Sequence, residues 1–299
     1  MAEQQPTENL RSLVDSAQEA IAAASQKQSL QLPYAAPDRR PNPAVETFDK
    51  VRSGLFGLAA VLLLITSLNA ALDTSFGSPA DILSTSQILA FIWPAIAVLM
   101  IASAIYSALP HQLSSRRQRA ITVYGLSGSA LMACALTFTA GFLLWPGAIL
   151  ATLATGFGLY GMLQMNRHTA RNHLERIATD LPVSLFSGFS LVFTVQLWLS
   201  ASGWNNAGHL LWISIASVVV TLLAVAFAQT ERGRHAFASG FSLGMLSAAF
   251  SAWRQESAPL WFAALLVFMA MIVFICAESR RFHIAHAEHR IQRGLRAEA

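Results

Sequence analysis

The chain has 299 residues, of which 54% are hydrophobic and only 12% are charged. Soluble globular domains carry about 25% charged residues, so this composition excludes an ordinary soluble protein and indicates a membrane protein. The formal net charge of +4 does not indicate nucleic-acid binding, because the basic residues are spread over short segments instead of forming one basic domain.

Residues 1–50 are interpreted as a cytoplasmic amino-terminal arm. After Thr7 as N-cap, apolar residues at helical spacing predict a short amphipathic helix, namely Leu10, Leu13, Val14, Ala17 and Ile21. An extended linker follows, marked by Pro33, Pro37, Pro41 and Pro43. The helix lies on the membrane surface, docks on a protein partner or is a loosely ordered tail, and the sequence leaves these alternatives open.

Eight apolar runs follow, and a transmembrane helix needs about 20 such residues. They are Val51–Leu72, Ser86–Leu109, Ala120–Leu143, Gly147–Met165, Pro182–Ala201, Ala207–Gln229, His235–Trp253 and Ala258–Ala277. Between the third and fourth runs, Trp145-Pro146-Gly147 is predicted to break the helix. Backbone polar groups in hydrocarbon must be satisfied internally, so the spans should be helices. The sequence therefore predicts an all-α, polytopic integral membrane bundle of about eight transmembrane helices over residues 51–277.

The basic residues predict an orientation for this bundle. They fall in alternate connections between the spans, and only Arg254 lies in one of the other connections. The positive-inside rule therefore predicts that both termini are cytoplasmic. Residues 278–299 are interpreted as a basic cytoplasmic tail that continues the last span as a helix. Arginines next to anionic lipid are favourable by about 1 kcal/mol each, so membrane anchoring accounts for them.

Glycine motifs inside the spans indicate helix packing. Gly156, Gly158 and Gly161 match the dinucleotide-binding fingerprint, but that fingerprint requires a preceding strand and a βαβ unit. Inside an apolar helix, glycines instead let two backbones approach closely. The same interpretation applies to Gly240 and Gly244 in the seventh span.

The sequence offers no constellation for catalysis or for metal binding. His283, His286 and His289 follow one another in the tail, but no cysteine or second histidine cluster completes a metal site. Ion pathways and proton relays use ionisable residues at membrane depth, and the middle of the spans has none. We therefore expect no enzyme, no metal and no ion-coupled pump, and the sequence does not predict a cofactor.

All seven tryptophans fall on the side of the membrane opposite to the basic connections. Three lie at the ends of spans and four lie deeper, and Pro94 after Trp93 is expected to bend its helix. An aromatic belt at the interface accounts for each tryptophan singly. Large rigid aromatics also line pockets for flat apolar ligands. The candidate ligand-binding residues are therefore Trp93, Pro94, Trp198, Trp212 and Trp261.

Several landmarks, taken in order, resemble one family. They are Asn69, Phe91-Ile92-Trp93-Pro94, Tyr106 with Pro110, Leu181-Pro182 through Gly188-Phe189, Gly203-Trp204 and Trp253. Between about Asp49 and Glu278, the chain resembles the larger bacterial multi-pass relatives of the tryptophan-rich sensory proteins, a group tied to the translocator (TspO/MBR) proteins. The translocator proteins have five spans, and the Asn and Trp motif of their third span is missing from Ser129–Phe138.

The resemblance implies a protein of the bacterial inner (plasma) membrane that binds tetrapyrrole-like or other hydrophobic small molecules in a sensory or regulatory role. Only Trp93 and Pro94 stand in a comparable aromatic–proline context. The leading hypothesis is thus a non-enzymatic integral membrane protein with a hydrophobic, planar ligand and the lipid bilayer as its partners. One alternative is a structural or assembly subunit that contacts membrane-protein partners through the amino-terminal arm. The other is a transporter without ion coupling, whose polar path would use Asn69, Gln87, Gln164 and Gln196.

Overall fold

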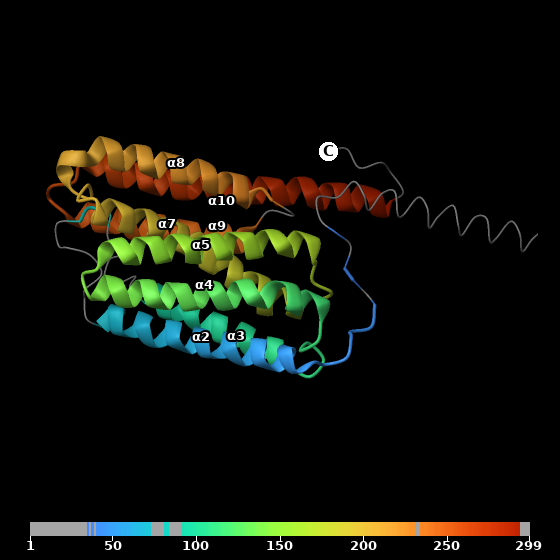
Figure 1. The fold of residues 1–299 in the computed structure, drawn as a ribbon. Coiled ribbons are helices and arrows are strands. Elements are labelled where there is room, and N and C mark those ends of the chain that lie inside the picture. The colour runs from blue at the N-terminus through green and yellow to red at the C-terminus, as the bar shows by residue number, and fades with distance from the viewer. Residues whose placement is uncertain are drawn as a thin grey trace, which may run out of the picture.

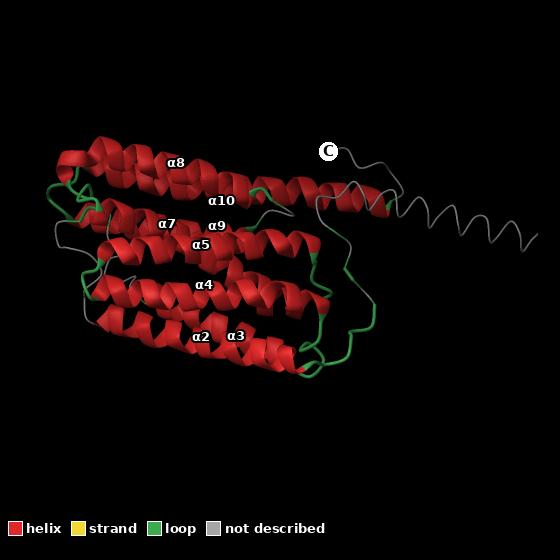
Figure 2. Cartoon of the chain, viewed as in Figure 1, coloured by secondary structure: helices red, strands yellow, loops and turns green. Residues whose placement is uncertain are grey.

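All regular secondary structure in the part of the chain that the computed structural model describes is helical (Figures 1 and 2). The described residues are 35, 37–38, 40–72, 81–83, 91–230 and 234–293. The long helices are α2 (Thr47–Leu72), α3 (Ile92–Ala108), α4 (Arg116–Ala140), α5 (Leu144–Arg167), α7 (Leu181–Ala201), α8 (Leu210–Ala228), α9 (His235–Arg254) and α10 (Leu260–Gln292). The short ones are α6 (His173–Glu175), a π-helical turn η2 (Arg176–Asp180) and a 3-10 turn η3 (Ala207–His209).

Each of the eight predicted spans corresponds to one long helix. Seven of these helices are long and apolar enough to cross a membrane, and the eighth, α3, is an apolar helix of 17 residues. The predicted fold class is therefore confirmed, and the protein is a multi-pass membrane protein. The predicted amphipathic helix near the amino terminus lies outside the described residues.

The helices lie side by side along one common direction, with α2 and α3 at one edge and α8 and α10 at the other (Figure 1). One apolar core joins α2, α3, α4, α5 and α7, and includes Phe56, Trp93, Met132 and Phe186. A second core joins α7, α8, α9 and α10, and includes Ile213, Phe241 and Phe262. Helix α7 contributes residues to both cores, and α5 adds Met162 to the second core, so the two groups of helices meet mainly on α7.

The connection between α4 and α5 differs from the prediction. The helix breaks at Gly141-Phe142-Leu143, where Phe142 has a φ of 60°. Trp145, Pro146 and Gly147 instead lie in the first turn of α5. Proline is tolerated there because a backbone N–H in the first turn has no intrahelical acceptor. The predicted helical hairpin is confirmed, but its break was placed a few residues too late.

Helices α7 and α9 cross in very close contact. A Cβ atom on Gly188 would overlap the carbonyl oxygen of Phe237, and one on Gly240 would overlap that of Leu185. A Cβ on Gly244 would lie 2.8 Å from the Cβ of Val192. The predicted role of Gly240 and Gly244 in helix packing is thus confirmed.

The fingerprint-like glycines of α5 divide into two kinds. A Cβ on Gly158 would lie 2.7 Å from Ser187 Oγ, and one on Gly161 would lie 2.7 Å from Tyr124 Cβ, so both pack against neighbouring helices. A Cβ on Gly156 would meet nothing within 4 Å. The packing interpretation therefore applies to two of the three glycines.

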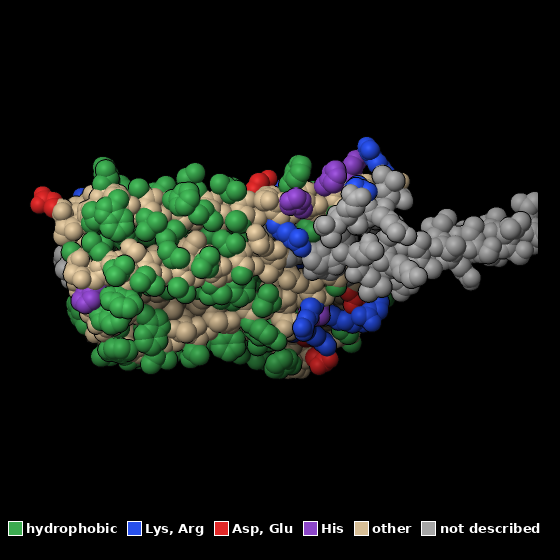
Figure 3. Space-filling view, turned by 90° about the horizontal axis from the view of Figure 1, so that it is seen from above, with side chains coloured by type: hydrophobic (Ala, Val, Ile, Leu, Met, Phe, Trp, Pro, Cys, Tyr) green, Lys and Arg blue, Asp and Glu red, His purple; other side chains and the backbone are tan. Residues whose placement is uncertain are grey.

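Apolar side chains cover the length of the bundle, whereas most of the charged residues gather at one end (Figure 3). Large aliphatic residues of α8 face outward, including Leu211, Val219 and Leu222. Beyond residue 277, α10 continues without a break to Gln292, as predicted for the tail, and extends past the other helices at the basic end (Figure 1).

Candidate functional site

Trp93 lies in the interior of the first helix group. Its side chain is fully buried, and its ring makes edge contacts with three phenylalanines of α7. The centroid distances are 5.9 Å to Phe186, 5.0 Å to Phe189 and 5.4 Å to Phe193. Edge-on packing of this kind contributes about 0.5–1.5 kcal/mol per pair beyond the burial of apolar area. Because Phe189 and Phe193 flank the midpoint of α7, Trp93 lies level with the middle of that helix.

These phenylalanines were not predicted from the sequence as part of the site. They occupy positions i, i+3 and i+7 of α7 and therefore share one face of that helix. The spacing was visible in the sequence, but apolar residues lie on every side of this span, so the pattern does not say which face meets Trp93. We refer to Trp93, Phe186, Phe189 and Phe193 as the Trp93 cluster.

The indole nitrogen of Trp93 is a buried donor. Within the described residues, Trp93 Nε1 is shielded from solvent and has no hydrogen-bond acceptor. A buried polar group without a partner costs about 1–3 kcal/mol, so such groups are rare in folded proteins. An aromatic belt at the interface does not account for this donor, because the ring does not reach the surface.

Pro94 does not bend its helix as predicted. It lies in the first turn of α3, which begins at Ile92, and it is buried beside Trp93. Proline fits the first turn of a helix without a kink, because no hydrogen bond is lost there. Its fixed backbone therefore helps to start α3 next to the Trp93 cluster.

The other three candidate tryptophans lie on the surface and have different neighbours. Trp198 is 38% exposed, donates a 2.8 Å hydrogen bond from Nε1 to Thr152 Oγ1, and contacts Trp145 at 5.6 Å between ring centroids. Trp212 is 52% exposed and lies 5.9 Å from Trp204. Trp261 is 56% exposed and contacts Phe262. In the described part of the chain, the four deeper tryptophans are therefore not gathered at one place.

At the basic end of the bundle, three arginines are buried among hydrogen-bond acceptors, namely Arg52, Arg117 and Arg234. Arg52 binds Asp49 at 3.1 Å, and Arg119 binds the same carboxylate at 2.6 Å, which ties α2 to α4. Arg117 pairs with Glu175 and Asp180 and so ties α4 to α6 and η2. From the sequence, the basic residues of these connections were interpreted as an orientation signal alone. Arg52, Arg117 and Arg234 also hold the basic ends of the helices together.

His168 lies in the loop after α5, and its surroundings lead us to expect that the folded protein loses stability in acid. Burial, together with the positive charges of Arg117 and Arg167, lowers the pKa of His168 below its ordinary value of 6.5. The unfolded chain therefore binds more protons than the folded protein between these two pKa values, and stability falls as the pH drops below about 6.5. A His168→Gln variant should lose less of its thermal stability between pH 7 and pH 5 than the wild type.

The measurement is the thermal unfolding midpoint of both proteins in detergent across that pH range, with His289→Gln in the tail as a control. If the His168→Gln variant and the wild type have parallel pH profiles, His168 does not contribute to the acid response.

No group of three or more His, Cys, Asp or Glu residues lies together in the described residues in a way that could hold a metal ion.

The model of the family described as TSPO-like protein matches residues 61–277. A search of curated proteins and a search of solved structures gave no match to the chain. The family match covers more than half of the chain and includes α3 and α7, which form the Trp93 cluster. The chain therefore belongs to the TSPO-like protein family.

Proposed function

We propose that the protein is a non-enzymatic membrane receptor that binds a hydrophobic, planar small molecule and acts in a sensory or regulatory role. The observation that carries this proposal is the buried Trp93 Nε1, which has no acceptor within the described residues. A ligand that brings an acceptor oxygen or nitrogen to Trp93 would satisfy this donor, and its flat face would pack on the surrounding rings. Tetrapyrroles with carboxylate or carbonyl groups have this combination of properties.

The binding site is closed in this structure, so binding requires a small movement. Trp93 is fully buried, and α3 packs chiefly on α2 while it contacts α7 through the Trp93 cluster. A ligand that replaced the edge-on contacts with stacking would separate α3 from α7. Because α7 also belongs to the second apolar core, such a movement would reach the second helix group. This coupling gives the sensory role a physical basis.

The proposal predicts a selective loss of affinity in a Trp93→Phe variant. Phenylalanine keeps an aromatic ring at this position but has no N–H donor, so the bound ligand loses one hydrogen bond. We expect porphyrin binding, measured by the change of its absorption spectrum on titration of the purified protein, to weaken by about tenfold. The surface variant Trp253→Phe is the matched control and should bind as the wild type does.

Two results would contradict this site. The first is a wild-type protein that gives no saturable porphyrin spectrum beyond that of empty detergent micelles. The second is a Trp93→Phe variant whose affinity equals that of Trp253→Phe. In contrast, unchanged unfolding of Trp93→Phe together with weaker porphyrin binding would support the site.

The same proposal places the protein in the bacterial inner membrane with both termini in the cytoplasm. The support is the alternation of basic connections, in which nineteen of the twenty Lys and Arg residues fall on one side. The loop around Trp204 would then face the outside. In a variant with both native cysteines, Cys134 and Cys276, replaced by serine, a cysteine introduced at Asn206 should react with a membrane-impermeant reagent in intact cells. If it reacts only after lysis, the orientation is the reverse.

A further inference from the structure

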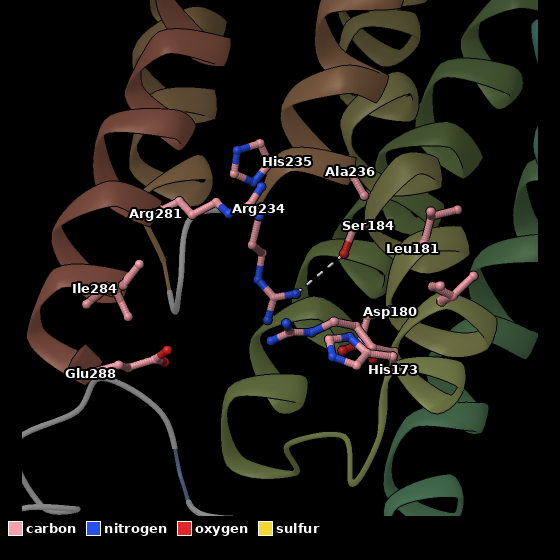
Figure 4. Close-up of a pocket in the computed structure, with 13 residues that line it drawn as sticks. His173, Asp180, Leu181, Ser184, Arg234, His235, Ala236, Arg281, Ile284 and Glu288 are labelled. Carbon is pink, nitrogen blue, oxygen red and sulfur yellow. Dashed lines mark hydrogen bonds between the residues drawn. The ribbon is translucent and has the colours of Figure 1, made fainter. Parts of the chain in front are cut away.

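A cleft of about 570 Å³ opens at the basic end of the bundle, at the ends of α7 and α9 opposite to Trp198 and Trp253. One wall is formed by α6, η2 and the start of α7, and the other by the part of α10 that continues past the bundle (Figure 4). The start of α9 lies between the two walls. Side chains from three separate stretches of the chain therefore meet in one hollow.

Arg234 is the buried basic residue of this cleft. Its side chain is only 6% exposed, and its Nη2 donates hydrogen bonds to Met162 O at 2.7 Å and to Asn166 Oδ1 at 2.6 Å. A third bond runs from Nη1 to Ser184 Oγ at 3.4 Å (Figure 4). These contacts fix the guanidinium between the walls, so its position does not depend on a ligand.

The charges that line the cleft are predominantly basic. Arg176 and Arg281 line it together with Arg234, whereas the acidic residues that line it are Asp180 and Glu288. Asp180 already forms an ion pair with Arg117, which lies outside the lining. The exposed side chain of Arg281 reaches from α10 toward Arg234 (Figure 4). Arginine is well suited to phosphate because its planar fork can donate two parallel hydrogen bonds.

The remaining lining is aliphatic. Ile177, Leu181, Ile284, Ala236 and Ala285 complete the walls, and Ile177 is 60% exposed. The cleft therefore combines arginines with an open aliphatic surface at the end of an apolar bundle. An anionic amphiphile has the matching chemistry, because its charged group suits the arginines and its chains suit the aliphatic surface. We propose that this cleft binds the phosphate headgroup of an anionic phospholipid, with Arg281 donating to the phosphate, the fixed positive charge of Arg234 beside it, and the aliphatic wall along the first part of the acyl chains. Such a lipid would hold α10 against α7 and α9.

The test uses the full-length protein in lipid nanodiscs made of phosphatidylcholine with increasing amounts of phosphatidylglycerol. The readout is the amount of each lipid that stays bound after transfer to detergent, measured by native mass spectrometry. We expect the wild type to retain phosphatidylglycerol selectively. Arg281→Gln should lower this retention by about fivefold, which corresponds to the loss of one arginine contact to anionic lipid. Arg281 is exposed, so its replacement should not impair folding.

Arg293→Gln is the matched control, because this exposed arginine lies near the end of the same helix but does not line the cleft. It should retain phosphatidylglycerol as the wild type does. Equal retention of the two lipids by the wild type, or equal loss in the Arg281→Gln and Arg293→Gln variants, would overturn the proposal. A further arm adds inorganic phosphate at millimolar concentration. If phosphate alone displaces the bound lipid completely, the cleft is a site for free phosphate and the lipid assignment is wrong.

Discussion

Gly188→Ala and Gly240→Ala should each reduce the free energy of unfolding by about 3 kcal/mol or more, because they force α7 and α9 apart. Each added methyl group would meet a backbone carbonyl oxygen, that of Phe237 or that of Leu185, and not the end of a flexible side chain. A backbone cannot move aside without shifting its whole helix. The measurement is thermal or denaturant unfolding of the purified variants in the same detergent.

The loss of stability in these two variants should be larger than the loss caused by an added methyl group in an ordinary core. Helix α7 belongs to both apolar cores, so a shift of its axis disturbs the packing of both helix groups. Between membrane helices, the attraction comes from close van der Waals contact, which decays steeply with separation. We therefore expect the two variants to lose their cooperative transition or to be recovered in low yield.

Gly156→Ala is the control that separates steric overlap from a general effect of glycine replacement. This glycine also lies in the middle of a long helix, but a Cβ there would meet nothing within 4 Å. Its replacement should leave the unfolding midpoint unchanged or raise it slightly, since alanine is the better helix former. If Gly156→Ala destabilised the protein as much as Gly240→Ala, the close α7–α9 crossing would not be the cause.

The helices could be predicted from the sequence because hydrocarbon imposes one secondary structure on long apolar runs. The boundary between α4 and α5 was less accurate, because Trp145-Pro146-Gly147 has the composition of a turn yet fits the first helical turn equally well. Gly240 and Gly244 were identified as packing residues from their spacing. The partner of that contact, Gly188, was not identified, although Ser184 four residues earlier forms a small-x-x-x-small pair with it.

The candidate site was less predictable than the fold. The tryptophans were grouped by their depth along the sequence, and depth does not say which side of a helix a residue occupies. Trp93 faces the interior, while Trp198, Trp212 and Trp261 face outward. In spans that are apolar on all sides, the interior face is set by helix packing, which depends on contacts between residues far apart in the chain. The Trp93 cluster, which joins α3 to α7, is such a contact.

The burial of the arginines could not be predicted from the sequence for a different reason. Basic residues near helix ends follow the positive-inside rule whether they are solvated or paired, so the pattern that predicts orientation carries no information about burial. Arg116 and Arg117 illustrate this ambiguity. They are adjacent in the sequence, yet the side chain of Arg116 is 38% exposed and that of Arg117 only 6%.

Arg117→Gln should therefore be strongly destabilising, whereas Arg116→Gln should not. Arg117 donates to His168 O at 2.7 Å and to Thr179, and it forms ion pairs with Glu175, at 3.6 Å, and with Asp180. Removing one partner of a buried ion pair costs about 3–5 kcal/mol, because the remaining charge stays buried without compensation. Glu175 is 1% exposed and would lose its ion pair, keeping only the backbone N–H of Arg171 as a donor to its carboxylate.

The neighbouring variant is a close control, since both changes remove one positive charge from the same helical turn. Arg116 contacts Asp38 at 3.4 Å and Pro41 O at 3.2 Å, near the surface, and such exposed contacts contribute little to stability. The comparison is made by thermal unfolding of both variants in detergent. Equal midpoints would mean that the arginines act only through the membrane orientation signal. A large loss for Arg117→Gln alone would instead mean that the connection from α4 to α7 depends on one buried guanidinium, and that the same basic residue serves both topology and packing.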